Sequence, residues 1–148
     1  MSRLSTWLAR LGLRRSLGGR GEQLAAAYLR RQGYRILARN LRNNFGEIDI
    51  LGQAPDGRTI VVVEVKSGAT ATAPGNNPGA RGKGETAIPP EQHVNRAKQR
   101  RLVALACQVA RRYKLTDHPI RFDVVGVVFH EGQKPQVRHH PGAFEAHV

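Results

Sequence analysis

The chain has 148 residues, with 24 Lys or Arg against 11 Asp or Glu, so its formal net charge is +13. This length is typical of one domain with a sizeable core, and a hydrophobic fraction of 40% excludes wholesale disorder. The single cysteine, Cys107, excludes an internal disulfide framework and a multi-cysteine zinc site. No apolar run approaches the ~20 residues that a membrane-spanning helix needs. The basic excess favours a polyanionic partner, above all nucleic acid.

Residues 1–18 form a basic segment in which apolar residues recur at helical spacing. It is a poor secretory signal, because Arg10 interrupts its apolar stretch and no small-residue cleavage site follows. We therefore expect a cytoplasmic protein with a flexible N-terminal tail. Contact of this tail with a membrane surface or a protein partner is the alternative.

Apolar residues at helical spacing, ended by Gly33, predict a helix over 19–32. Short apolar runs then predict strands at 34–37, 47–51 and 59–66. A turn-rich segment at 53–58 predicts a hairpin between the last two strands.

The segment 68–90 is rich in Gly and Pro and lacks periodicity, which predicts a long mobile loop inside one domain, 19–148. A second helix is expected over 91–113, a strand over 122–129 and a weaker strand from Val137. This order of elements predicts an α/β fold, with a mixed β-sheet flanked by helices.

Charged residues occupy positions where the pattern asks for apolar side chains. Glu22 projects from the core-facing side of the first helix, and Asp49 lies between two isoleucines of a strand. Glu64 and Lys66 are two residues apart in a Val-rich strand, so they point to the same face of the sheet.

The hairpin sets the spacing of two of these acids. If Pro55–Arg58 form a four-residue loop, Asp49 falls directly opposite Glu64, at a Cβ separation of ~5 Å. Two carboxylates so close need an offsetting charge, such as a divalent cation with oxygen ligands. A slip of one residue would put the two acids on opposite faces of the sheet.

This constellation suits phosphodiester hydrolysis. Asp49 and Glu64 would ligate Mg²⁺ or Mn²⁺, Glu22 would complete the metal shell, and Lys66 would orient water or stabilise developing charge. The alternative is a set of solvated strand-end charges that contribute little.

Basic side chains on the second helix and near the first would track a phosphate backbone; we single out Arg42, Lys98, Arg100 and Arg101. Aromatic residues make up only 5%, so base stacking has little support. We expect Asp123 to make hydrogen bonds at the start of a strand, with a metal-ligand role as the alternative. His139 and His140 would point to opposite faces of a strand, which makes them poor joint metal ligands.

Several of these residues lie in motifs that resemble the YraN family of small bacterial proteins. The motifs are Gly21-Glu22-x-x-Ala25, Gly33-Tyr34, Phe45-Gly46-Glu47-Ile48-Asp49, Val63-Glu64-Val65-Lys66, Lys98-x-x-Arg101-Leu102 and Arg121-Phe122-Asp123-Val124-Val125. The resemblance covers about residues 19–146. The segment 68–90 looks like an insertion, and the tail lies outside the resemblance.

That family is similar to the PD-(D/E)XK nucleases, which have a restriction-endonuclease-like fold, and especially to archaeal Holliday junction resolvases. The resemblance implies that Asp49 is the first metal-binding acid and that Glu64 and Lys66 are the (D/E)XK pair. It implies that Glu22 is the helix glutamate and that Lys98 is the basic position of the second helix.

The sequence thus favours a metal-dependent endonuclease acting on DNA rather than RNA, with branched or otherwise structured DNA as the candidate substrate. Two alternatives are a non-catalytic nucleic-acid-binding module of the same fold and a basic scaffold or interaction protein. A homodimer is a further expectation, because similar resolvases act on a symmetric junction as dimers.

Overall fold

The computed structural model of the chain describes residues 14–15, 19–44, 46–70, 94–112, 114–130 and 132–146. It contains two helices and six strands in these ranges. In chain order they are β1 (Arg14–Arg15), α2 (Arg20–Arg31), β2 (Arg35–Asn43), β3 (Gly46–Gln53), β4 (Ile60–Thr70), α3 (Arg96–Arg112), β5 (Ile120–His130) and β6 (Gln136–Phe144).

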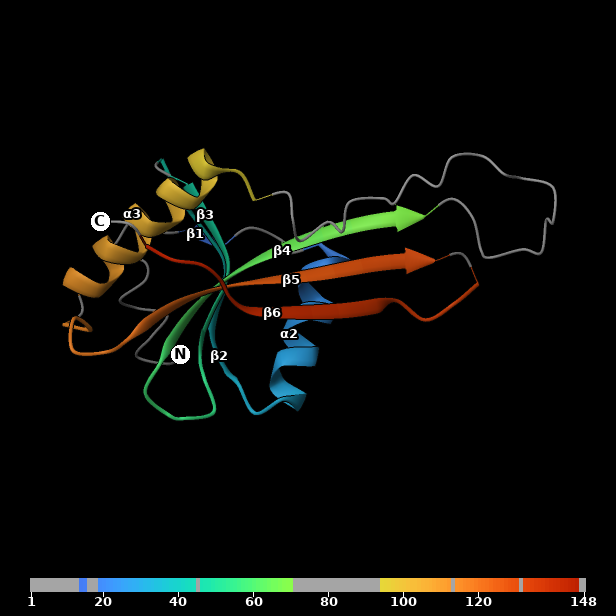
Figure 1. Cartoon of the computed structure of the whole chain (residues 1–148), viewed down its shortest axis with the longest axis horizontal. Coiled ribbons are helices and arrows are strands. Elements are labelled where there is room, and N and C mark those ends of the chain that lie inside the picture. The colour runs from blue at the N-terminus through green and yellow to red at the C-terminus, as the bar shows by residue number, and fades with distance from the viewer. Residues whose placement is uncertain are drawn as a thin grey trace.

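The strands form one sheet in the order β1-β2-β3-β4-β5-β6 (Figure 1). All neighbouring strands are antiparallel except β4 and β5, which are parallel. A parallel pair needs a crossover connection, and α3 belongs to that connection. The expected α/β fold, with a mixed sheet flanked by helices, is confirmed.

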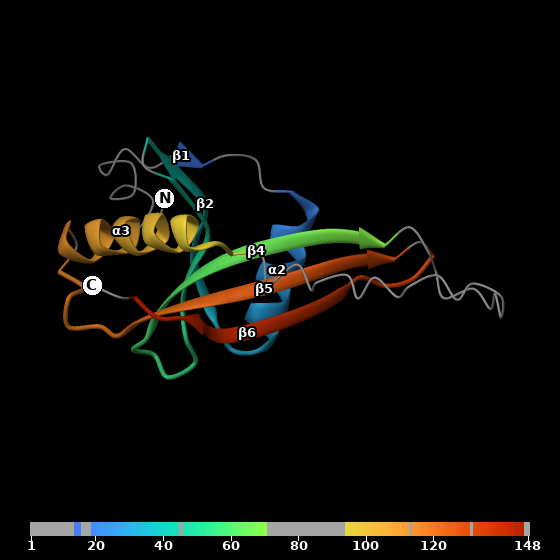
Figure 2. The same cartoon turned by 45° about the horizontal axis from the view of Figure 1, so that its top comes forward.

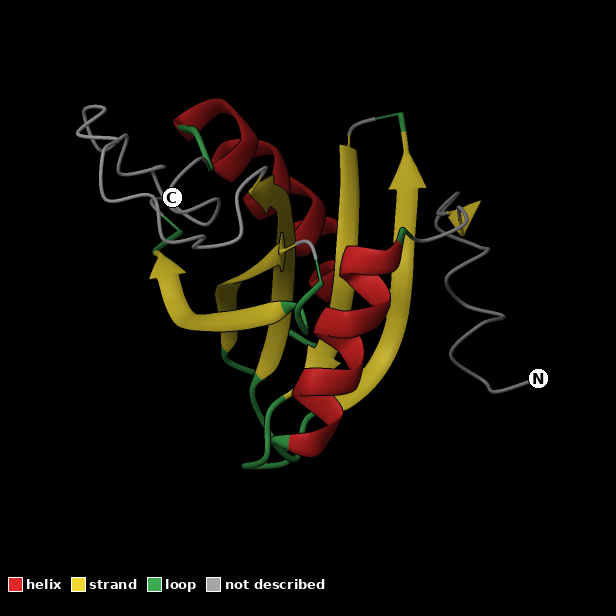
Figure 3. Cartoon of the chain, turned by 90° about the vertical axis from the view of Figure 1, so that its right-hand side faces the viewer, coloured by secondary structure: helices red, strands yellow, loops and turns green. Residues whose placement is uncertain are grey.

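The two helices pack on separate hydrophobic clusters on opposite faces of the sheet. Helix α2 packs with alternate residues of β3, β4 and β5, among them Ile50, Val63 and Val125. Helix α3 packs with residues of the other face, among them Leu51 and Val62. Figures 2 and 3 show α2 along the long strands and α3 nearer the β2–β3 end of the sheet.

The hairpin between β3 and β4 has the predicted register. Ala54 N–H donates to the carbonyl of Thr59 at 2.9 Å, and Asp56 accepts hydrogen bonds from the Arg58 and Thr59 N–H groups. The paired residues run back to Ile50 and Val63, as the four-residue loop requires. In this register Asp49 and Glu64 are the next two residues opposite each other, one step beyond Ile50 and Val63.

Two strand predictions were too short. The strand predicted at 34–37 is the first part of β2, whose remaining residues include Arg39, Asn40 and Arg42, side chains that do not resemble a strand pattern. The strand predicted at 59–66 continues as β4 to Thr70, because its last residues pair with β5. The predicted loop 68–90 therefore begins inside β4, and the remainder of it lies outside the described residues.

Helix α2 confirms the first predicted helix to within one residue at each end. The second predicted helix, 91–113, begins too early, because residues 94 and 95 are not helical. Asn95 caps α3 instead: its Oδ1 accepts a hydrogen bond from Lys98 N–H at 2.9 Å. Strands β5 and β6 confirm the predictions at 122–129 and from Val137. Of the predicted tail, only residues 14–15 are described.

Candidate active site

Asp49 and Glu64 lie where the backbone pairing of β3 with β4 ends and a side-chain hydrogen bond takes its place. The ladder of paired residues ends at Ile50 and Val63. One step further, Asp49 Oδ2 accepts a hydrogen bond from the backbone N–H of Val65 at 2.7 Å. The carboxylate thus satisfies a backbone donor of the neighbouring strand and is held beside Glu64.

Strand β2 contributes to this geometry from the other side of β3. Asn40 lies between the paired residues Arg39–Ile50 and Leu41–Ile48, and therefore opposite Asp49. Its φ of 51° falls in the left-handed region, which asparagine tolerates better than most residues do. Asn40 and Asp49 are both buried polar residues, so the left-handed residue of β2 lies opposite the acidic position.

Glu64 is the most enclosed member of the group, with 2% of its surface exposed. Its Oε1 forms an ion pair with Lys98 Nζ and lies 3.5 Å from Lys66 Nζ. Its Oε2 is buried and accepts no hydrogen bond while Asp49 and Glu64 are both ionised. A buried carboxylate oxygen without a donor is costly, so a proton shared with Asp49 or a bound cation has to offset this cost.

The pKa values of Asp49 and Lys98 also indicate that the two carboxylates need a neutralising charge. Burial, followed by the negative charge of Glu64, raises the pKa of Asp49 to about 8. Burial alone would lower the pKa of Lys98, but its hydrogen bond to Glu64 and the charges of Glu64 and Asp49 raise it. At neutral pH the acidic pair therefore keeps a proton unless a cation takes its place.

The donor set fits a hard divalent cation. Within the part of the chain that the structure describes, no group of three or more His, Cys, Asp or Glu side chains gathers. Asp49 and Glu64 supply two carboxylates, and Mg²⁺ is characteristically held by one or two carboxylates together with water and phosphate oxygens. The Oε2 atom of Glu64, which has no hydrogen-bond donor while both acids are ionised, is the atom most available to such an ion.

The structure does not bring Glu22 into contact with the other predicted site residues. Glu22 lies in the first turn of α2, and its Oε2 is 2.8 Å from where a Cβ on Gly19 would stand. Among the described residues it forms no hydrogen bond or ion pair with Asp49, Glu64 or Lys66. Gly21 brings the start of α2 close to Ser67 of β4, since a Cβ there would stand 1.9 Å from Ser67 Oγ.

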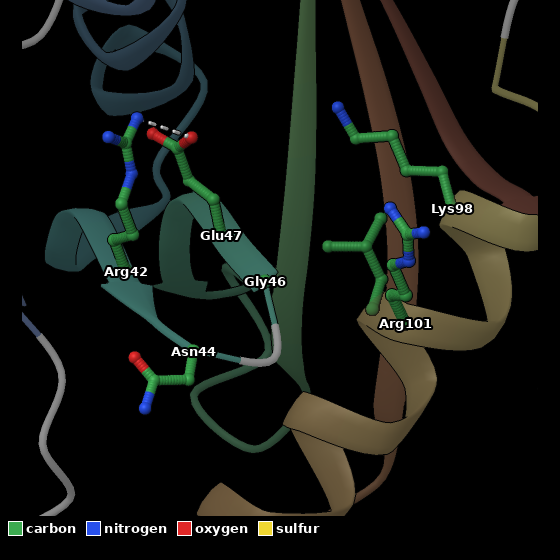
Figure 4. A pocket seen from close by; sticks show the side chains of 7 residues that line it. Arg42, Asn44, Gly46, Glu47, Lys98 and Arg101 are labelled. Carbon is green, nitrogen blue, oxygen red and sulfur yellow. Dashed lines mark hydrogen bonds and ion pairs between the residues drawn. The ribbon is translucent and has the colours of Figure 1, made fainter.

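A basic pocket of about 810 Å³ lies between the β2–β3 connection and the start of α3 (Figure 4). Its lining residues are Arg42, Asn44, Gly46, Glu47, Lys98, Arg101 and Leu102. Three of the four residues predicted to bind nucleic acid thus gather in one place, whereas Arg100 is exposed and does not line this pocket. Arg42 and Glu47 form an exposed ion pair at 3.0 Å. Glu47 lines the pocket but was not among the site residues predicted from the sequence. Lys98 joins the pocket to Glu64.

Asp123 is buried on the opposite face of the sheet and is fully hydrogen-bonded. It accepts two hydrogen bonds from Arg121 at 2.8 Å and one from Gly142 N–H at 3.0 Å, and it contacts His139 Nε2 at 2.7 Å. Burial alone would raise the pKa of Asp123, but these hydrogen bonds lower it to about 2. The predicted hydrogen-bonding role is confirmed.

The two adjacent histidines of β6 differ as predicted. His139 is nearly buried beside Asp123, and His140 is exposed. Arg121 and Tyr34 also belong to this network, in which Arg121 Nη2 donates to the Tyr34 hydroxyl at 2.8 Å, and no pattern in the sequence predicted them as partners.

The fold and the site define a class of protein: an α/β protein whose mixed sheet holds a buried aspartate–glutamate pair flanked by two lysines. Among the described residues, no helix is long and apolar enough to cross a membrane.

The chain belongs to the family described as "Uncharacterised protein family UPF0102", the YraN family, whose model matches residues 21–127. It is 42% identical over 131 residues to a UPF0102 protein of Geobacter metallireducens, covering 88% of this chain and 93% of that protein. It is 42% identical over 132 residues to one of Anaeromyxobacter dehalogenans, covering 89% and 86%. A relative from Rhodococcus opacus is 36% identical over 129 residues, covering 87% and 96%. The expected family is thus confirmed.

Proposed function

We propose that this protein is a metal-dependent nuclease that hydrolyses phosphodiester bonds in DNA, with Asp49 and Glu64 holding Mg²⁺ or Mn²⁺. The proposal depends chiefly on one observation: the carboxylates of Asp49 and Glu64 are buried side by side, and Glu64 Oε2 has no hydrogen-bond donor while both acids are ionised. An acid retained only for stability would be expected to have its oxygens satisfied.

The residues around the pair have separate roles. A bound Mg²⁺ or Mn²⁺ supplies charge neutralisation at the phosphate and activation of water. Asp49 is fixed by Val65 N–H, which leaves its second oxygen for the cation. Lys66, 3.5 Å from Glu64, is placed to orient the attacking water or to stabilise charge on the phosphate. Lys98 positions Glu64 through their ion pair.

The basic pocket supports a polynucleotide substrate. Arg42, Lys98 and Arg101 present three cations in the pocket, which Lys98 joins to Glu64, and Glu47 is the one acid among the residues lining it. Cationic side chains of this kind contact phosphates without reading base sequence. We therefore place the DNA backbone in this pocket. We take branched or otherwise structured DNA as the preferred form, in keeping with the similarity to junction resolvases.

The second candidate is a DNA-binding module that does not cleave. It is favoured by the two lysines that already neutralise Glu64 without a metal ion, as they would in a purely structural cluster. This candidate predicts DNA binding with no product under any divalent metal.

Cleavage assays separate the two candidates. Wild-type protein is incubated with labelled duplex, four-way junction and single-stranded RNA, in Mg²⁺, in Mn²⁺ and in EDTA. We expect metal-dependent cutting of DNA, abolished by Asp49→Asn and by Glu64→Gln while binding persists. Asp117→Asn and Glu145→Gln, which change exposed acids in the same way, are the matched controls and should cut normally. Cutting that survives at Asp49→Asn and Glu64→Gln would overturn the proposal, as would DNA binding without product in every metal.

A further inference from the structure

Lys98 belongs both to the acidic pair's surroundings and to the basic pocket. Its Nζ forms an ion pair with Glu64 Oε1, and its side chain lines the pocket together with Arg42 and Arg101. Figure 4 shows Lys98 and Arg101 on α3 and Arg42 on the opposite side of the pocket. Of the two described lysine partners of Glu64, Lys98 alone lines the pocket. A change in what Lys98 binds would therefore affect both places.

Two of the three cations in the pocket already have an acidic partner. Arg42 is paired with Glu47, and Lys98 is paired with Glu64. Arg101 forms no ion pair with any other residue that the structure describes. An ammonium group that is held by a buried carboxylate is less available to a phosphate, because the two acceptors compete for it. While Lys98 is held by Glu64, the pocket therefore attracts DNA less strongly than its lining residues suggest.

The charges around Glu64 balance without a metal ion when both acids are ionised. Asp49 and Glu64 supply two carboxylates, and their charges are offset by two ammonium groups, those of Lys66 and Lys98. A divalent cation on the carboxylates brings a surplus of two positive charges to a site where Glu64 is 2% exposed. Like charges repel strongly where little water screens them. We therefore expect one ammonium group to leave Glu64 when a cation binds.

Lys98 is better placed to leave than Lys66. The Lys98 side chain is 40% exposed, against 24% for Lys66, and Lys66 does not line the pocket. Lysine carries its charge on a flexible four-carbon stem, so the ammonium group can move while the helix stays in place. Lys98 and Arg101 are three residues apart on α3, which puts them on the same side of the helix. A phosphate beside Arg101 would therefore be within the reach of Lys98.

We propose that Lys98 exchanges partners: it positions Glu64 in the absence of a metal ion, and it binds a DNA phosphate in the pocket once a divalent cation occupies the acidic pair. The exchange couples the two ligands, because each of them relieves the repulsion that opposes the other. By thermodynamic linkage, a cation that strengthens DNA binding is itself bound more tightly in the presence of DNA, by the same factor. This inference rests on the proposed function, since it takes the cation site of Asp49 and Glu64 as its starting point.

Metal binding in the absence of DNA gives the first test. Mn²⁺ affinity is measured by calorimetric titration for wild type, Lys98→Met and Lys98→Arg; methionine keeps an unbranched stem and removes the charge. We expect Lys98→Met to bind Mn²⁺ about fivefold more tightly than wild type, because no ammonium group on α3 then competes for Glu64. Lys98→Arg keeps the positive charge and should bind Mn²⁺ much as wild type does. Weaker or unchanged Mn²⁺ binding by Lys98→Met would overturn the inference, because Lys98 would then support the ion or have no effect on it.

Duplex binding gives the second test. Fluorescence anisotropy of a labelled duplex is measured in EDTA and in saturating Mn²⁺, directly after mixing, and gel electrophoresis confirms that the duplex is intact. Wild type should bind about tenfold more tightly in Mn²⁺ than in EDTA. Lys98→Met should match wild type in EDTA and lose a large part of the gain in Mn²⁺. An equal loss in both conditions would make Lys98 a permanent phosphate contact and overturn the exchange, as would a full gain in the variant.

The matched control is Arg101→Met, which removes the neighbouring pocket cation, one that forms no ion pair with Glu64. It should leave Mn²⁺ binding unchanged and weaken duplex binding about threefold, by the same factor in EDTA and in Mn²⁺. Circular dichroism checks that each variant is folded, and Lys98→Gln takes the place of Lys98→Met if that variant is not. A rise in Mn²⁺ affinity in Arg101→Met equal to that in Lys98→Met would show a general charge effect and overturn the inference.

The outcome is separable from that of the proposed function. If wild type does not cut DNA under any metal but Lys98→Met shows both expected changes, the nuclease proposal fails and the exchange stands. If wild type cuts DNA in Mn²⁺ while Lys98→Met binds Mn²⁺ no more tightly than wild type, the exchange fails and the nuclease proposal stands.

Discussion

Two buried acidic groups lie on opposite faces of the same sheet, and their carboxylates differ in the hydrogen-bond partners that they have. Asp123 has each carboxylate oxygen engaged by at least two partners from Arg121, His139 and Gly142. Asp49 and Glu64 face each other, and one Glu64 oxygen has no hydrogen-bond donor while both acids are ionised. The pKa of Asp123 is lowered by its partners, and that of Asp49 is raised by burial and by Glu64.

The hydrogen bonds of Asp123 stabilise the fold, whereas the close approach of Asp49 and Glu64 destabilises it. Asp123 ties β6 to β5 and, through Arg121 and Tyr34, to the segment after α2. The Asp49–Glu64 pair places like charges together at a cost in stability, which a bound cation would repay. Where a sheet contains both kinds, the unsatisfied pair is the better candidate for function.

The largest effect on stability is expected at Asp123. Asp123→Ala leaves Arg121 without its buried partner, and breaking a buried charged pair typically costs about 3–5 kcal/mol. Urea unfolding should show this loss in the free energy of unfolding, with Asp117→Asn unchanged as the exposed control. A loss below about 1 kcal/mol would remove the distinction between the two acidic groups.

A smaller effect of opposite sign is expected at Asp49, and it should depend on pH. The carboxyl holds its proton in the folded state up to about pH 8 and in the unfolded state only up to about 3.8. Folding therefore binds a proton between these values, and the metal-free protein loses stability as pH rises through this window.

Asp49→Asn removes that dependence. Its amide oxygen can still accept from Val65 N–H, and the amide can donate to Glu64. In EDTA we expect the variant to be more stable than wild type, with a gap that widens from pH 5 to pH 8 and reaches about 1 kcal/mol or more. A variant less stable than wild type at pH 8 would contradict the view that the pair is strained.

Asp123 gives the reverse dependence at low pH. Its folded pKa of about 2 lies below the ordinary value of 3.8, so its stabilisation is present above that value and is lost as pH falls toward 2. Acid unfolding of wild type should therefore be steeper than that of Asp123→Asn.

The smallest effect contrasts two neighbouring arginines of α3. Arg101 lines the basic pocket, whereas Arg100 does not. Arg101→Ala should weaken DNA binding about threefold and reduce the salt slope by about one. Arg100→Ala removes the same charge one residue away and should change neither. Equal effects of the two substitutions on the salt slope would mean that the pocket does not direct the DNA.

Local patterns in the sequence predicted much of this arrangement. The Pro55–Arg58 turn alone set the register that puts Asp49 beside Glu64, because hairpin geometry depends on a few adjacent residues. Helix α2 followed from its apolar stripe. The predicted length of β2 was too short, because its basic and polar residues lack the apolar pattern of a strand and are held in β2 by pairing with β3.

What the sequence could not supply depends on contacts between distant segments. Arg121 and Tyr34 are 87 positions apart, so no spacing rule connects them. The ion pair of Lys98 with Glu64 depends on where α3 begins, and the sequence pattern did not single out Asn95 as the cap that precedes Arg96. The predicted part of Glu22 in the metal shell remains a prediction, because in the described part of the structure its side chain forms no hydrogen bond or ion pair with Asp49 or Glu64.

Calorimetric titration with Mn²⁺ tests most directly whether Asp49 and Glu64 form a cation site. Wild-type protein at pH 7 should bind about one ion and release about one proton, measured as heat that varies with the ionisation enthalpy of the buffer. Asp49→Asn should lose both the binding and the proton release, and Asp123→Asn should keep both. Mn²⁺ binding that is undiminished in Asp49→Asn, or absent from wild type, would contradict the cation site.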